Sequence, residues 1–224
     1  ALATNTTGQY QTAMGQGALY ASNADHNSAF GVSALSACTT GVHNTAMGRN
    51  AASALTTGTN NISIGNYTMN GTATGSSNIA VGYAALNEKT QGSLVAVGSQ
   101  AMYSNNGGIQ NTAVGHGAMY TNVTGGSNTA CGYLALNQNT GDGNSGFGND
   151  ALRLNTSGEK NTALGNEALE NNTTANHNTA VGHESLTANT TGTFNTAVGS
   201  LALKTITTNS TCTAIGYAAL KLNT

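Results

Sequence analysis

The sequence predicts an all-β protein, a parallel β-solenoid of about 13 stacked coils of 16–17 residues each. The main observation is a glycine that follows a small residue and an apolar one at positions 15, 31, 48, 65, 82, 98, 115, 132, 148, 165, 182, 199 and 216. The chain also contains no proline, which favours uninterrupted backbone pairing. Only 6% of its residues are charged, and its formal net charge is −2. So regular a period is typical of stacked equivalent coils rather than of a globule around a pocket.

The repeat crosses every candidate domain boundary, so we expect residues 1–224 to form a single repeat domain. Because residue 1 is Ala and no leader is visible, we expect this domain to be a fragment of a longer fibre. We number each coil so that its recurring glycine is position 5, as in residues 178–194, which read NTAVGHESLTANTTGTF. The coils then start near residues 11, 27, 44, 61, 78, 94, 111, 128, 144, 161, 178, 195 and 212.

Two short apolar segments recur in every coil. Position 4 is apolar throughout, position 8 is usually Ala, and position 9 is Leu or Met in all coils except the one with Ala52. Because turn residues follow each segment, the pattern predicts two short strands per coil, with positions 4 and 9 filling the core. The many Gly, Thr and Asn residues make a helix unfavourable. The core is thin, so we expect chains to associate laterally, with small residues at positions 3 and 8 allowing close approach.

Asparagine recurs in two columns. At position 1 it occupies consecutive coils as Asn111, Asn128, Asn144, Asn161, Asn178 and Asn195. At position 12 it does so as Asn105, Asn122, Asn139, Asn155, Asn172 and Asn189. Stacked amides can bond to the identical residue one coil away, so both columns predict amide ladders. Asn also suits turns, and this is the alternative reading.

The element NTAVGxxA resembles the repeat units in the heads of trimeric autotransporter adhesins of the YadA type. The longer unit NTAVGxxALxxNTTG resembles arrays in phage tail fibres and related bacterial surface proteins. The resemblance covers the whole chain. It implies a left-handed β-roll that assembles as a homotrimer and serves attachment. The resemblance brings no catalytic residue to this sequence. This unit is longer than that of the adhesin heads, so the second half of the coil is expected to form a broader loop.

Three carboxylates share position 7 in consecutive coils: Asp150, Glu167 and Glu184. Stacking would bring them to about 5 Å from one another, where like charges repel unless they are neutralised. One hypothesis is a calcium ion on this column; the alternative is a solvated acidic face. Arg153 and Glu170 share position 10 in neighbouring coils and should form an ion pair.

Tyr103 and Tyr120 share position 10 in neighbouring coils, and Tyr20 occupies it near the start. Exposed tyrosines offer flat faces to sugar rings, so Tyr103 and Tyr120 are candidate contacts for a host glycan. The alternative is packing between coils that supports the rod. The five histidines lack metal-ligand spacing, and we interpret them as solvated turn residues.

The three cysteines, Cys38, Cys131 and Cys212, lie five or six coils apart. That separation excludes a disulfide within one chain. They are expected to act as small apolar residues, with pairing between chains as the alternative.

These features favour a structural attachment protein over an enzyme. We expect a shaft or head segment of a trimeric fibrous adhesin or phage tail fibre, located outside the cell on a cell surface, virion tail or secreted filament. Its expected partners are further copies of itself and a host glycan or receptor, without nucleic acid or membrane insertion. The alternative is a self-assembling extracellular filament subunit. An ice-binding solenoid or a polysaccharide-cleaving tailspike using Asp150 and Glu167 is disfavoured.

Overall fold

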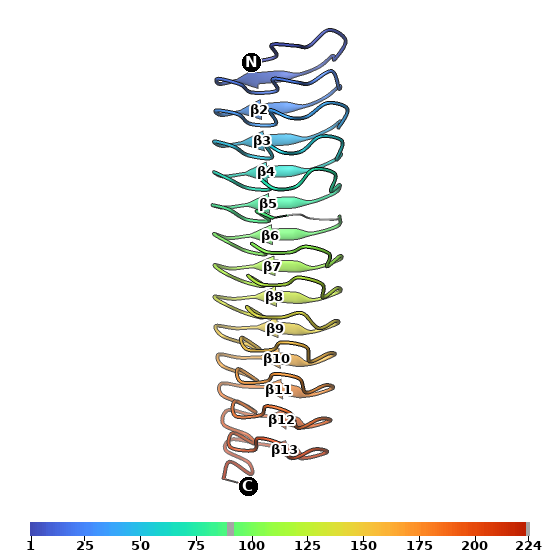
Figure 1. The fold of residues 1–224 in the computed structure, drawn as a ribbon. Coiled ribbons are helices and arrows are strands. Elements are labelled where there is room, and N and C mark those ends of the chain that lie inside the picture. Colours follow the sequence, from blue (N-terminus) through green and yellow to red (C-terminus); the bar gives the residue numbers. More distant parts are fainter. Residues whose placement is uncertain (89–91, 223–224) are drawn as a thin grey trace. The chain divides into compact units, whose positions relative to one another are not determined.

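The computed structural model describes residues 1–88 and 92–222. The chain forms two compact units, residues 1–110 and residues 111–224. Each unit is a parallel β-solenoid in which successive coils contribute one strand each (Figure 1). The predicted all-β solenoid is therefore confirmed, whereas the interpretation of residues 1–224 as a single domain stays a prediction.

Every strand has three residues and occupies positions 2 to 4 of its coil. The first unit contains β1 (Thr12–Met14), β2 (Ser28–Phe30), β3 (Thr45–Met47), β4 (Ile62–Ile64), β5 (Ile79–Val81) and β6 (Val95–Val97). The second contains β7 (Thr112–Val114), β8 (Thr129–Cys131), β9 (Ser145–Phe147), β10 (Thr162–Leu164), β11 (Thr179–Val181), β12 (Thr196–Val198) and β13 (Thr213–Ile215). Pairing follows the repeat: Val114 of β7 lies opposite Cys131 of β8, both at position 4.

Within residues 1–88 and 92–222 each coil has one strand, so the prediction of two was wrong. The second apolar segment is a turn in which positions 7 and 9 are left-handed, as at Glu167 (φ 56°) and Leu169 (φ 52°). Hydrogen bonds between coils hold this conformation. Glu167 N–H donates to Asn149 O of the preceding coil (2.9 Å), and Leu169 N–H donates to Ser185 O of the next (3.0 Å). These bonds offset the strain of non-glycine residues in this region.

Position 5 requires glycine for two reasons, which Gly165 illustrates. Its φ is +142°, a conformation that side chains with a Cβ rarely adopt. A Cβ there would also lie 2.5 Å from the carbonyl oxygen of Gly182 in the next coil. Glycines stacked on glycines therefore let the backbones meet at this corner.

The interior is lined by positions 3, 8 and 9, because alternate strand residues face opposite sides. In the second unit, Ala163, Ala168 and Leu169 are fully buried, as are their counterparts in the neighbouring coils. Position 4 points outward instead: Leu164 is 50% exposed and Val114 is 39% exposed. The expectation that position 4 fills the core was thus wrong. So was the suggestion that small residues at positions 3 and 8 lie between chains, since these residues pack inside their own coils.

Both predicted asparagine ladders are confirmed, and both are buried. At position 1, Asn161 Oδ1 accepts the backbone N–H of Asn178 (2.9 Å), while Asn161 Nδ2 donates to Ala175 O (2.7 Å). At position 12, Asn172 Nδ2 donates to Asn155 Oδ1 (2.6 Å). The amides thus satisfy buried backbone groups as well as one another.

Candidate functional site

The outward face of the sheets is an apolar surface, formed by position 4 and, in part, by position 2. No residue in β1–β13 is charged, and the position 4 side chains are apolar throughout. Exposure reaches 67% at Met14 in the first unit and 73% at Ile215 in the second. A continuous apolar column is uncommon on the surface of a monomeric protein and often marks an interaction site.

The outward face is most apolar in β4, β5 and β6, where position 2 is also aliphatic. The six outward residues of this patch are Ile62, Ile64, Ile79, Val81, Val95 and Val97. Ile62 and Ile79 are each 39% exposed. In the second unit, position 2 is always Thr or Ser, so only position 4 provides the apolar column there.

Asp150, Glu167 and Glu184 occupy equivalent places in successive coils, as expected from the repeat. Two of them already have cationic partners. Arg153 Nε lies 3.2 Å from Asp150 Oδ1, and Lys204 Nζ lies 2.5 Å from Glu184 Oε2. Hydrogen bonding to Lys204 lowers the pKa of Glu184 below its ordinary value.

The predicted ion pair between Arg153 and Glu170 is confirmed. Arg153 Nη2 lies 2.5 Å from Glu170 Oε1, and this hydrogen bond is the main cause of a raised pKa for Arg153. Within residues 1–88 and 92–222, no group of three or more His, Cys, Asp or Glu side chains is arranged to hold a metal ion. Lysine and arginine thus neutralise part of the position 7 column, and the calcium hypothesis stays a prediction.

The two candidate glycan-contacting tyrosines lie in different units, Tyr103 in the first and Tyr120 in the second. Both are half-buried. Tyr20, which shares their position in the repeat, is 52% exposed. A glycan contact at Tyr103 and Tyr120 stays a prediction.

Aromatic stacks at other positions were missed by the sequence reasoning. In the first unit Tyr10, His26 and His43 stack almost in parallel, with ring centroids 4.8 and 4.9 Å apart. In the second unit His116 stacks on Tyr133 at 5.5 Å, and His177 on Phe194 at 5.0 Å. The signal was present in the spacing, since these residues recur at the last position of the coil or at position 6. Taking the histidines as isolated solvated residues overlooked it.

A further aromatic cluster lies at positions 6 and 7 of the first unit. The guanidinium carbon of Arg49 lies 5.5 Å from the centroid of the Tyr67 ring. The ring of Tyr67 meets that of Tyr83 edge to face, with centroids 6.2 Å apart. Three consecutive coils thus contribute one residue each to a mixed cationic and aromatic surface.

The three cysteines are free thiols in different settings. Cys38 replaces the position 12 asparagine and is fully buried, and burial raises the pKa of its thiol to about 11. It therefore acts as the small apolar residue that was predicted. Cys131 instead lies exposed on the outward sheet face at position 4.

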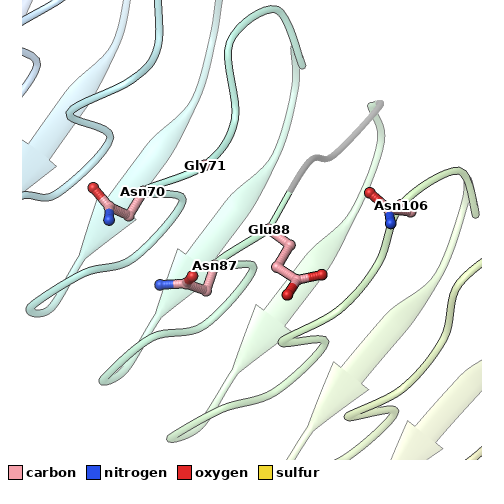
Figure 2. Close-up of a pocket in the computed structure, with 5 residues that line it drawn as sticks. All are labelled: Asn70, Gly71, Asn87, Glu88 and Asn106. Carbon is pink, nitrogen blue, oxygen red and sulfur yellow. The ribbon is translucent and has the colours of Figure 1, made fainter.

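The first unit also has an open pocket of about 360 Å³, lined by Asn70, Gly71, Asn87, Glu88 and Asn106. Figure 2 shows these residues on the turns of successive coils, with the Glu88 carboxylate between Asn87 and Asn106. Asn87 Nδ2 donates to the carbonyl oxygen of Tyr67 (2.9 Å). Glycoside hydrolysis ordinarily uses two carboxylates, and this lining supplies only one. The pocket therefore gives no support to a polysaccharide-cleaving site.

In the described part of the chain, no helix has the length and apolar character needed to cross a membrane. Comparisons with protein-family models, with curated proteins and with solved structures found no match for this chain.

Proposed function

We propose that this chain is a structural attachment protein, a shaft or head segment of a fibrous adhesin or phage tail fibre that functions outside the cell. The observation that carries the proposal is the outward apolar column at position 4. The interior is already filled by the chain's own Ala, Leu, Met and Asn side chains, so this column is not needed for the core. It is available for association.

The partner we propose for this face is a further copy of the same chain. The face is uncharged, so two copies can meet without desolvating unpaired charges. Both copies also carry side chains at the same spacing of about 4.8 Å between strands, so rows on one copy can fit between rows on the other. Three copies are proposed because the repeat resembles those of trimeric adhesins.

Many coils must take part in such an interface. Covering a half-exposed Val or Leu contributes about 1 kcal/mol, roughly half of the value for full burial. Association costs at least about 4 kcal/mol in lost freedom. A few coils therefore do not suffice, whereas the seven position 4 residues of β7–β13 exceed that lower bound.

Sedimentation equilibrium of the wild type and a double variant, Leu164→Glu/Val181→Glu, tests the proposal. Two carboxylates on the outward face would have to be desolvated at the interface, so the variant is expected to sediment as a monomer. The matched control is Thr174→Glu/Thr191→Glu, which places two charges on exposed turns of the same coils. This control should remain oligomeric.

The Cys131 thiol provides a second readout on the same face. Alkylation by N-ethylmaleimide should be slow in the assembled wild type and fast in the Leu164→Glu/Val181→Glu variant. A monomeric wild type with rapidly alkylated Cys131 would contradict the proposal. Long filaments in electron micrographs would instead favour the alternative of an end-to-end polymer.

A further inference from the structure

We propose that Arg49, Tyr67 and Tyr83 form a binding site for an acidic saccharide, one that carries a carboxylate on a sugar ring. This inference deepens the proposed attachment function and rests on it, since it names the class of ligand that such a fibre would engage. The site differs from the candidate contacts at Tyr103 and Tyr120.

The geometry provides a flat surface next to a positive charge. Arg49 lies over the ring of Tyr67 at 5.5 Å, which orients its guanidinium through a cation–π contact. Tyr83 meets the Tyr67 ring edge to face and is 55% exposed, so its ring remains available to a ligand. Because adjacent coils are about 4.8 Å apart, the cluster spans roughly 10 Å, the length of one or two sugar rings.

Arg49 has no carboxylate partner among the described residues of the first unit. The described part of the first unit has two carboxylates, Asp25 and Glu88. Asp25 lies near the end of its coil, where its Oδ1 accepts the backbone N–H of Gln9 (2.7 Å). Glu88 lines the pocket of Figure 2. Within residues 1–88 and 92–110, no carboxylate lies within ion-pair distance of Arg49. In the second unit, by contrast, Arg153 is paired with both Asp150 and Glu170. Arg49 is thus free to bind an external anion.

The surrounding groups favour a sugar over other anions. The backbone N–H of Arg49 donates to Asn66 Oδ1 (3.0 Å), and the exposed side chain of Asn66 also carries an amide NH2 that can donate to a ligand. Arginine binds carboxylates in a bidentate manner, and aromatic rings pack against the C–H faces of sugars. A single cation cannot neutralise a row of phosphates, so a nucleic acid is a poorer match. An acidic peptide would offer the carboxylate without a ring for Tyr83.

Calorimetric titration with tetragalacturonate and with its methyl ester tests the site directly. The ester has the same rings and hydroxyl groups but no charge. The wild type is expected to bind the acid about tenfold or more tightly than the ester. The proposal would be overturned if the wild type bound both ligands with equal affinity or bound neither. It would also be overturned if tetraglutamate bound as tightly as tetragalacturonate.

Variants then assign the binding to the three residues. Arg49→Gln should weaken binding of the acid about tenfold or more. The affinity of Arg49→Lys should lie between those of the wild type and Arg49→Gln, because lysine retains the charge without the planar guanidinium. Tyr83→Ala should weaken binding several-fold, as expected for the loss of one aromatic contact. Tyr83→Phe keeps the ring and should not weaken binding. The matched control is Arg153→Gln, which removes an arginine whose charge is already paired and should leave binding unchanged. Unchanged binding in Arg49→Gln would also overturn the proposal.

Circular dichroism and sedimentation of the same samples separate this inference from the proposed function. Arg49 and Tyr83 are exposed and outside the strands, so their variants should keep the fold and the oligomeric state. Loss of saccharide binding with assembly intact supports this site. A wild type that assembles but binds no acidic saccharide overturns the site alone, and a monomeric wild type overturns the proposed assembly.

Discussion

The two units share one backbone design but fill it differently. In the second unit, position 12 holds five consecutive asparagines, residues 122, 139, 155, 172 and 189. In the first unit, the same position holds Ser22, Cys38, Leu55 and Thr72 before Asn105. All of these side chains are buried. The coil therefore accepts either an amide ladder or a mixture of small and apolar residues at one interior position, whereas the glycine of position 5 is common to both units.

The surfaces differ as well. The first unit contains four charged residues, Asp25, Arg49, Glu88 and Lys89, whereas the second contains ten. All the ion pairs found in the described residues lie in the second unit. The first unit has the broader apolar patch on β4–β6. Backbone pairing between coils therefore constrains the interior corner strictly and the surface columns loosely.

The largest expected effect concerns the feature that the units share. Gly65→Ala in the first unit and Gly165→Ala in the second should each lower the free energy of unfolding by about 3 kcal/mol or more, because both combine strain with a clash. In each case the new Cβ would lie 2.5 Å from a carbonyl oxygen of the next coil. Urea unfolding followed by circular dichroism measures the loss.

Gly146→Ala is the control for these two variants. Gly146 lies at position 3, where the neighbouring coils have Ala130 and Ala163, and its added Cβ would lie 3.3 Å from the nearest atom. Its stability should stay within about 1 kcal/mol of the wild type. A loss as large as that of Gly165→Ala would mean that the corner is not special.

The second prediction breaks the amide ladder that distinguishes the second unit. Asn172→Leu keeps the branched shape of the side chain but removes the donor to Asn155 Oδ1 and the acceptor of Asn189 Nδ2. It also removes one of the two donors to Ala175 O, which keeps its hydrogen bond from Asn161 Nδ2. One unsatisfied buried acceptor costs about 1–3 kcal/mol and each further lost hydrogen bond about 0.5–1.5 kcal/mol, so we expect a loss of about 2–4 kcal/mol in urea unfolding. Leu55→Met, at the same position in the first unit, should cost less than about 1.5 kcal/mol. Equal losses would show that the ladder does not distinguish the units energetically.

The third prediction uses the thiol that replaces an asparagine in the first unit. Burial raises the pKa of Cys38 from 9.0 to about 11. Between these values the unfolded chain releases the thiol proton while the folded chain keeps it, so stability falls as pH rises from about 9 to 11 and is unaffected below 9. Two pKa units correspond to about 3 kcal/mol.

Unfolding measured at pH 8 and pH 11 in the wild type and in Cys38→Ala isolates the contribution of the Cys38 thiol, since other titrating groups contribute equally to both proteins. The difference in stability between the two proteins should change by about 2 kcal/mol over this interval, because at pH 11 half of the folded chains have also lost the thiol proton. A difference that does not change with pH would rule out the effect of burial on Cys38.

The smallest effect is expected for the charges that are abundant in the second unit. A double-mutant cycle with Arg153→Gln and Glu170→Gln should give a coupling energy below about 1 kcal/mol, because both side chains are partly exposed. The coupling should decrease further in 1 M salt, where the pair is screened. A coupling of several kcal/mol that persists in salt would mean that the ion pairs, and not the amides, stabilise this unit.

The repeat alone was enough to predict the fold class, the register of the coils and the two asparagine ladders. A fixed period is sufficient for this, because parallel pairing places equivalent residues opposite each other, as Val114 and Cys131 are. The ion pair of Arg153 with Glu170 followed from the same register. The stacking of Tyr10, His26 and His43 could have been derived in the same way.

The direction in which the apolar residues face became clear only from the packing of the folded coils. Side chains in a three-residue strand alternate between its two faces, but this alternation does not say which face is buried. The larger residue at position 4 indicated burial more strongly than the alanine at position 3. The Leu or Met of position 9 fills the space opposite the strand, as Leu136 does at Gly146, and leaves room only for a small side chain at position 3. The larger residue of position 4 therefore points outward and becomes the candidate interface. The contact of Arg49 with Tyr67 also depended on the structure, because left-handed turns at positions 7 and 9 orient these side chains through hydrogen bonds that no short stretch of sequence encodes alone.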